Sequence, residues 1–113
     1  MIPDYQFGQI TINGQDYYHD VIVNWQGRVE KWWREESHKI KPSDIEKALD
    51  FKPELIVIGT GESGIAEVLP ETQQRIIDEG IGLIIKKTPR AIDLFNENLK
   101  KNKKVVGCFH LTC

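Results

Sequence analysis

The chain has 113 residues, with 15 basic and 17 acidic side chains and a formal net charge of -2. That length suits one domain with its own hydrophobic core. The charge balance offers no extended field for nucleic acid, no apolar run approaches the roughly 20 residues that cross a bilayer, and the first residues lack an export pattern, so we expect no nucleic acid, no membrane and a cytoplasmic location.

The first third of the chain predicts antiparallel strands. Residues 5–12 alternate apolar and polar side chains, and the dipeptide Asn13-Gly14 that follows is typical of a two-residue hairpin turn. The chain is expected to return from this turn as a strand, and residues 21–23 and 28–32 are expected to form two more.

The hydrophobic period changes near residue 40. Ser43-Asp44-Ile45-Glu46 has the spacing of a capping box, in which the serine accepts from the backbone of Glu46 and the glutamate reaches back. We expect a helix to begin there and to end before Pro53.

The second half alternates apolar runs with helical periodicity. Residues 55–58 read as a strand covered on both faces, residues 83–85 and 105–111 as two further strands, and helices are predicted to begin at Pro70 and to be capped at Thr88. This order favours parallel pairing through right-handed crossovers. We therefore predict one α/β domain over residues 1–113, with three layers and a mixed central sheet that has an antiparallel N-terminal part and a C-terminal βαβαβ unit.

Three glycines follow the central apolar run, within Gly59-Thr60-Gly61-Glu62-Ser63-Gly64. Their spacing matches a dinucleotide fingerprint, but the predicted helix begins only at Pro70 and no lysine of a P-loop follows, so we expect no cofactor. Either the glycines permit a tight turn with positive φ, or the loop amides and nearby hydroxyls bind a small anion or polar ligand. The ligand-binding candidates are Gly59, Thr60, Gly61, Ser63 and Thr88.

The C-terminal segment His110-Leu-Thr-Cys113 contains residue types that bind metals. On a strand, however, only Cys108 and His110 share a face, and two ligands do not make a zinc site, so no metal is expected. The spacing from Cys108 to Cys113 would put their α-carbons roughly 16 Å apart on opposite faces, which predicts free thiols.

Aromatic and cationic side chains gather between residues 25 and 38. Trp32 and Trp33 are adjacent and take opposite faces of a strand, so one of them is expected to be exposed. Tryptophan with arginine is the usual composition of a protein-binding hot spot, and the alternative is a tryptophan packed under an arginine stem on an ordinary surface. The interaction-surface candidates are Trp32, Trp33, Arg34 and His38.

Several short motifs together resemble one known family. They are Phe7-Gly8, Asp20-Val21, Trp33-Arg34 with His38, the buried strand into Gly59-Thr60-Gly61, Thr88 with Ala91 and Phe95-Asn96, and the terminal Phe109-His110-Leu-Thr-Cys113. Nearly end to end, they resemble the small domain of unknown function shared by the animal adipogenesis-associated protein and a mitochondrial respiratory complex I assembly factor. The ending is more similar to the first of these. The resemblance implies a three-layer α/β fold with a mixed central sheet and supplies no catalytic residues.

Two functions stay open on the sequence. The first, which we expect, is a non-enzymatic binding or assembly-factor-like module that contacts a protein partner through the Trp32 to His38 surface. The second is a small-ligand or anion binder, or an enzyme, with a cleft at residues 59–64 and with Arg34 or His38 supplying charge. No Ser, His and acid trio and no paired carboxylates stand out from the spacing, which weakens the enzyme hypothesis.

Overall fold

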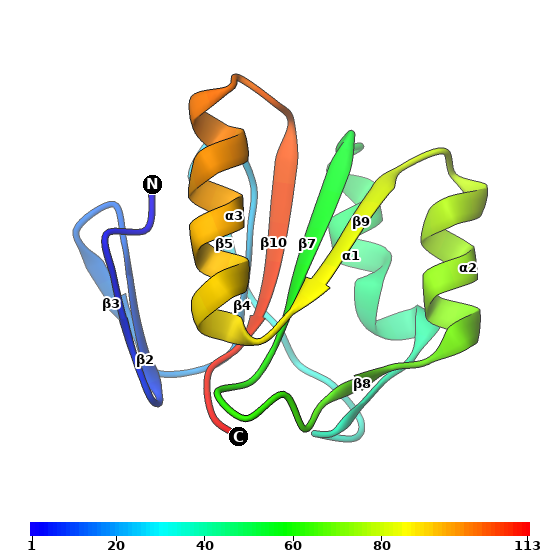
Figure 1. Ribbon diagram of the computed structural model, residues 1–113, viewed down its shortest axis with the longest axis horizontal. Helices are drawn as coiled ribbons and strands as arrows, with labels where there is room; N and C mark the ends of the chain where they lie inside the picture. The colour runs from blue at the N-terminus through cyan, green and yellow to red at the C-terminus, as the bar shows by residue number, and fades with distance from the viewer.

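The computed structural model describes all residues from 1 to 113. Its centre is a five-stranded sheet in the order β5-β4-β10-β7-β9 (Figure 1). These strands are β4 (Val21–Val23), β5 (Val29–Lys31), β7 (Leu55–Thr60), β9 (Gly82–Lys86) and β10 (Val105–His110). The helices are the 3-10 helix η1 (Pro42–Ile45), α1 (Glu46–Asp50), α2 (Pro70–Asp78) and α3 (Thr88–Lys100).

Two smaller sheets flank the central one. A three-stranded antiparallel meander contains β1 (Asp4–Gln6), β2 (Gln9–Ile12) and β3 (Gln15–Tyr17). A short parallel pair contains β6 (Lys39–Ile40) and β8 (Glu67–Val68).

The central sheet is mixed, as predicted. β7 pairs in parallel with β10 on one side and with β9 on the other, so that Leu55 lies opposite both Val105 and Gly82. β4 joins β10 antiparallel, and β5 joins β4 antiparallel. All residues of β7 are buried, which agrees with an apolar strand covered on both faces. The expected βαβαβ unit is thus confirmed as β7, α2, β9, α3 and β10.

Helices cover both faces of the sheet and complete three layers (Figure 1). On one face, α3 packs through Ala91 and Phe95, and Ile10 of the meander joins the same core cluster. On the other face, Ile45 of η1 and Ile76 of α2 pack in a second cluster. No helix of the chain combines the length and the apolar character needed to cross a membrane.

The predicted strand over residues 5–12 is wrong, because the chain turns within it. Phe7-Gly8 forms a two-residue turn between β1 and β2, with Gln6 opposite Gln9. Gly8 has φ +80, a conformation that glycine adopts without steric cost, and the turn splits the run into two strands. The predicted hairpin turn at Asn13-Gly14 is confirmed, since both residues have positive φ between β2 and β3.

Two predicted helix caps are also wrong. The first helical turn begins at Pro42, and the carboxylate of Asp44, not the side chain of Glu46, accepts from the backbone N–H of Lys41 at 2.8 Å. At α3 the N-cap is Lys87, and no side chain caps the helix. The Thr88 hydroxyl is hydrogen bonded to other segments instead, which gives it a different role.

Candidate functional site

Asp20, Arg34 and His110 form a charged cluster where β10 ends. Oδ2 of Asp20 accepts from Nη1 of Arg34 at 2.8 Å and from Nδ1 of His110 at 2.7 Å. Its other oxygen, Oδ1, accepts from the backbone N–H of Leu111 at 2.8 Å. Asp20 precedes β4, Arg34 follows β5 and His110 ends β10, so antiparallel pairing of these strands brings the three side chains together.

Arg34 is held by more than this ion pair. Its side chain is only 4% exposed, and its guanidinium lies 4.3 Å from the centre of the Trp32 ring. Nη2 donates to the carbonyl oxygen of Ser37 at 2.9 Å. The arginine therefore fixes the backbone from residue 32 to residue 37 against the end of the central sheet.

Hydrogen bonds and ion pairing hold Asp20 in its ionised form. Burial by itself would raise the pKa of Asp20, but hydrogen bonds from His110 and Leu111 and attraction to His110 and Arg34 outweigh it and hold that pKa below its ordinary value. Because Nδ1 of His110 donates to Asp20, it cannot also accept from Nη2 of Arg34, which lies 3.1 Å away. Asp20 is thus an ionised acceptor shared by two donors.

The cluster has the connectivity of an acid, histidine and hydroxyl triad. Nε2 of His110 lies 3.5 Å from Oγ1 of Thr112, at the outer limit of a hydrogen bond. The side chain of His110 is 5% exposed, however, and none of the surface hollows is lined by Asp20, Arg34 or His110. The geometry therefore supports a structural role for the cluster, which joins three segments that are distant in sequence.

The four interaction-surface candidates separate into buried and exposed pairs. Trp32 is 3% exposed, and its Nε1 donates to the carbonyl oxygen of Asp44 at 2.8 Å. Trp32 and Arg34 are therefore interior residues, which corrects the expectation that they form a surface. Trp33 is 71% exposed and His38 is exposed as well, its ring edge-on to that of His110. Trp32 and Trp33 point in opposite directions, and η1 covers the side of Trp32.

A hollow of about 240 Å³ lies beside Trp33. The buried side chains of Ile22 and Trp32 contribute its apolar part. The remaining lining is polar and of both charges, and comprises Lys31, Ser43, Asp44, Glu46 and Lys47. An exposed indole next to a concave, partly apolar surface is the arrangement found at protein-binding hot spots.

The ligand-binding candidates of the glycine segment do not converge on one site. Gly59 lies inside β7, and Thr88 is fully buried, accepting from the N–H of Gly61 at 2.8 Å and donating to the carbonyl oxygen of His110 at 2.6 Å. Thr60 is buried and donates to the carbonyl oxygen of Lys86 at 3.2 Å, whereas Ser63 is exposed.

Most amides of this loop are hydrogen bonded within the chain. The C-terminal residues accept from it, with Glu62 N–H donating to the Thr112 carbonyl at 2.7 Å and Ile65 N–H to the Cys113 carbonyl at 3.2 Å. Gly61 has φ +105, and a Cβ there would collide with the Cys113 carbonyl. The glycine therefore serves a positive-φ turn and a close backbone approach.

Another hollow, of about 400 Å³, adjoins the loop where β7 and β9 end. It lies between the start of α2, β8 and the side chain of Ile85. Its lining residues are Thr60, Gly64, Ile65, Ala66, Glu67, Val68, Pro70, Gln73 and Ile85. Of the sequence-predicted ligand candidates, only Thr60 contributes to it.

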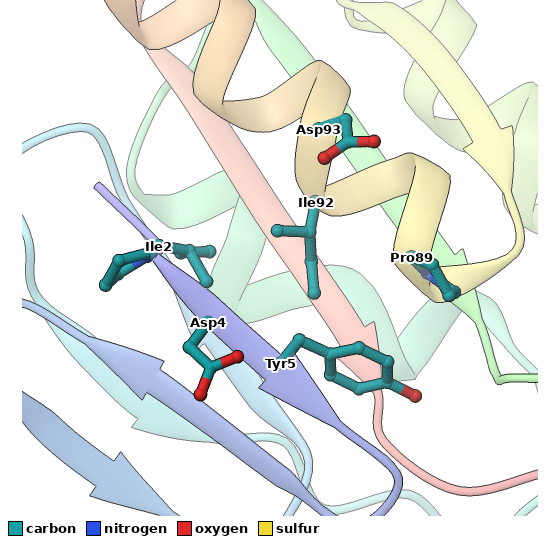
Figure 2. Close-up of a pocket in the computed structure, with 7 residues that line it drawn as sticks. Ile2, Asp4, Tyr5, Pro89, Ile92 and Asp93 are labelled. Atoms are coloured by element: carbon teal, nitrogen blue, oxygen red, sulfur yellow. The ribbon is translucent and has the colours of Figure 1, made fainter.

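A third hollow, of about 220 Å³, separates β1 from the start of α3. Ile2, Tyr5 and Ile92 form its floor, and Figure 2 shows the carboxylates of Asp4 and Asp93 well apart on either side of that floor. Because these carboxylates do not point at a common position, they do not form a cation site.

Asn96, a residue of the motifs quoted above, has a structural role near this hollow. Asn96 forms two hydrogen bonds with the backbone of Ile2, of 2.9 and 2.8 Å, and so fixes the first strand to α3.

Both cysteines are free thiols, as predicted, and burial raises the pKa of Cys108 to about 12. The Cys108 thiol is therefore un-ionised and inert near neutral pH.

Asp20 and His110 are the partners that hold Arg34 in place, and spacing alone did not identify them. The signal available was weak: a carboxylate directly before a strand, and a histidine at the end of an otherwise apolar strand. Both residues belong to the motifs on which the family resemblance rests. The structure explains why these motifs occur together, since it brings them into contact.

The chain is similar to known proteins over nearly its whole length. A family model described as a protein of unknown function (DUF498/DUF598) matches residues 2–110. The crystal structure of the conserved hypothetical protein PH1505 from Pyrococcus horikoshii OT3 is 31% identical, with a TM-score of 0.90, over 100% of this chain and 99% of that one. A structure named MT938 is 28% identical, with a TM-score of 0.84, over 100% and 98%.

A more distant structure shares the fold. A protein from Bordetella pertussis, described as a Mth938-like domain, is 18% identical, with a TM-score of 0.72, over 98% of this chain and 85% of that one. These matches confirm the resemblance to a small domain of unknown function and the mixed α/β fold. Their names assign no activity, substrate or partner.

Proposed function

We propose that this chain, which belongs to the DUF498/DUF598 family of proteins of unknown function, is a protein-binding module of the assembly-factor type whose contact surface centres on Trp33. The observation that carries the proposal is that an indole 71% exposed is held on a backbone segment that buried contacts immobilise.

Both neighbours of Trp33 in the sequence are anchored. Trp32 is buried and donates to the carbonyl oxygen of Asp44, and Arg34 is bound by Asp20 and by the carbonyl oxygen of Ser37. A surface side chain on a fixed backbone loses less conformational entropy on binding than one on a mobile loop. Trp33 is thus pre-organised for contact with a partner.

The hollow beside Trp33 supplies the second feature of a contact surface. Ile22 and Trp32 give it an apolar part that can receive a side chain, and Lys31 and Glu46 lie on its rim. Central apolar contact with a polar rim is the usual anatomy of a protein interface. We therefore expect an apolar or aromatic residue of the partner to pack between Trp33 and this hollow.

Small-ligand or anion binding at residues 59–64 is the alternative function. The amides of Gly61 and Glu62 are hydrogen bonded to Thr88 and to Thr112, and that of Gly64 is bonded to Gly61 within the loop. No observation at this loop favours a ligand over those internal contacts, so the proposed function does not depend on it.

The test is an affinity measurement on a purified partner. The tagged chain would first be used to co-purify proteins from cells that produce it, and the protein recovered in stoichiometric amount would then be purified. Calorimetric titration would compare the unchanged chain with Trp33→Ala. Loss of a hot-spot tryptophan weakens binding by about 2 kcal/mol or more, or about thirtyfold.

Ile77→Ala provides the matched control, since Ile77 is also an exposed apolar residue at 54% and lies on α2, away from the hollow beside Trp33. The control should bind with unchanged affinity, and both variants should unfold at the same urea concentration as the parent chain. Equal affinities of the parent chain and the Trp33→Ala variant would overturn the proposal.

A further inference from the structure

The last strand of the central sheet, β9, has an open edge. It pairs only with β7, and the N–H of Gly82 donates to the carbonyl oxygen of Glu54 at 3.0 Å. Backbone groups alternate in direction along a strand, so Leu83 and Ile85 direct their N–H and C=O groups away from β7. These four groups have no strand partner.

The edge is also incompletely covered by side chains. All six residues of β7 are buried, whereas Leu83, Ile84 and Ile85 are only partly buried. β9 contains no proline, which is one of the usual devices that prevent pairing at an edge. The opposite edge strand, β5, has only three residues and offers a shorter template.

A partly apolar hollow lies at the carboxyl end of this strand. The hollow of about 400 Å³ is lined by Ile85 of β9 together with Ile65, Val68 and Pro70. A strand paired with β9 would therefore place one of its side chains at the hollow. Strand addition next to a side-chain pocket is a recurring mode of peptide recognition, in which backbone bonds give affinity and the pocket gives specificity.

The charges around the hollow select the kind of segment. Lys86 is the last residue of β9, and Lys87 connects this strand to α3. Both lysines are exposed, and neither makes an ion pair. The stem of Lys87 packs over Gly64, which lines the hollow, so its ammonium group lies near that rim. Glu67 lines another part of the hollow and would repel an acidic residue placed there.

We propose that the open edge of β9 binds an extended acidic-apolar segment of a partner protein as an additional strand. One apolar side chain of the segment enters the hollow at Ile65, Val68 and Ile85, and an acidic side chain faces Lys86 and Lys87. The site goes beyond the proposed contact surface at Trp33, because Trp33 follows β5 and β5 and β9 are opposite edges of the sheet.

Random heptapeptides displayed on phage provide a probe that needs no known partner. Panning against the purified chain should enrich sequences with an apolar residue close to Asp or Glu, and the enriched peptide would be synthesised. Hydrogen exchange followed by NMR should then show the amides of Leu83 and Ile85 protected about tenfold or more by the peptide, because these N–H groups become hydrogen bonded.

Charge reversal tests the lysines. The double variant Lys86→Glu and Lys87→Glu should weaken binding of the acidic peptide about tenfold, whereas the control Lys100→Glu and Lys101→Glu, with the same charge change at the end of α3, should leave it within about twofold. Protection of other amides, the absence of any enriched sequence, or self-association that protects Leu83 and Ile85 without peptide would each overturn the proposal. Trp33 plays no part in this experiment. Failure of the proposal for β9 can therefore be distinguished from failure of the proposed function at Trp33.

Discussion

Nδ1 of His110 donates a hydrogen bond of 2.7 Å to Oδ2 of Asp20, although 90 positions separate the two residues. The same oxygen accepts from Arg34, so a single carboxylate ties the start of β4, the segment after β5 and the end of β10 together. The exposed Trp33 directly precedes this buried arginine. The stability of the cluster and the presentation of the indole are therefore linked.

Removal of the shared carboxylate should be costly. Asp20→Ala leaves Arg34 buried, with its side chain 4% exposed, and without its ionic partner, which is expected to lower the free energy of unfolding by about 3–5 kcal/mol. Urea unfolding followed by circular dichroism measures this loss. Asp50→Ala, which removes an exposed carboxylate without an ion pair, should change stability by about 0.5 kcal/mol or less. Similar losses in both variants would contradict the role given to Asp20.

The same carboxylate should make stability depend on acid pH. The pKa of Asp20 is held below its ordinary value in the folded chain, so its contribution is complete above the unfolded pKa of about 3.9 and is lost as the pH falls through the folded pKa. The difference in unfolding free energy between the parent chain and Asp20→Asn should therefore be largest above about pH 5 and should narrow toward about pH 3. Urea titrations across this pH range measure the difference in unfolding free energy. A difference that does not change with pH would contradict the contribution assigned to the ionised Asp20.

Local signals in the sequence were sufficient to predict most of the elements. The apolar run at residues 55–58 and Pro70 are local features, and they predicted β7 and the start of α2 correctly. Strand order is not local: β10 lies between β7 and β4 because α3 carries the chain back across β7, and nothing in the spacing requires it. The same limit applies to contacts between segments.

The candidate site shows this limit clearly. Alternation predicted that Trp32 and Trp33 would face opposite ways, but which one is buried depends on η1, whose Asp44 carbonyl accepts from the indole of Trp32. The glycine segment suggested an anion site, but the amides of Gly61, Glu62 and Ile65 are bonded to Thr88 and to the last two residues. Thr88 lies 27 positions after Gly61, and the last two residues are at the other end of the chain. A local sequence pattern cannot reveal contacts over such separations.

The Thr88 hydroxyl should matter more than its methyl group. Thr88→Val has the same shape but leaves the buried N–H of Gly61 and the carbonyl of His110 without their partner, which should cost about 1–3 kcal/mol. Thr88→Ser keeps both bonds and loses one methyl group, for about 1 kcal/mol. Denaturation midpoints should therefore rank the parent chain above serine and serine above valine. A valine variant as stable as the serine variant would refute the bridging role.

Two glycines with positive φ offer a matched comparison. Gly80, at φ +74, has open space around it, so Gly80→Ala should cost only the conformational strain of about 1–2 kcal/mol. Gly61→Ala adds a collision with the Cys113 carbonyl to a similar strain, so its unfolding free energy should be lower still. NMR shifts of Thr112 and Cys113 should change only in the Gly61 variant, and unchanged shifts there would show that the C-terminal residues do not fill the loop.

Cross-linking from position 33 in cells is the decisive experiment on the contact surface at Trp33. Trp33 would be replaced by the photoreactive residue p-benzoylphenylalanine, and Ile77, exposed on α2, would be replaced in parallel. Position 33 should give a discrete protein adduct that excess unlabelled chain suppresses and excess Trp33→Ala chain does not. No adduct from position 33, or the same adducts from both positions, would contradict it.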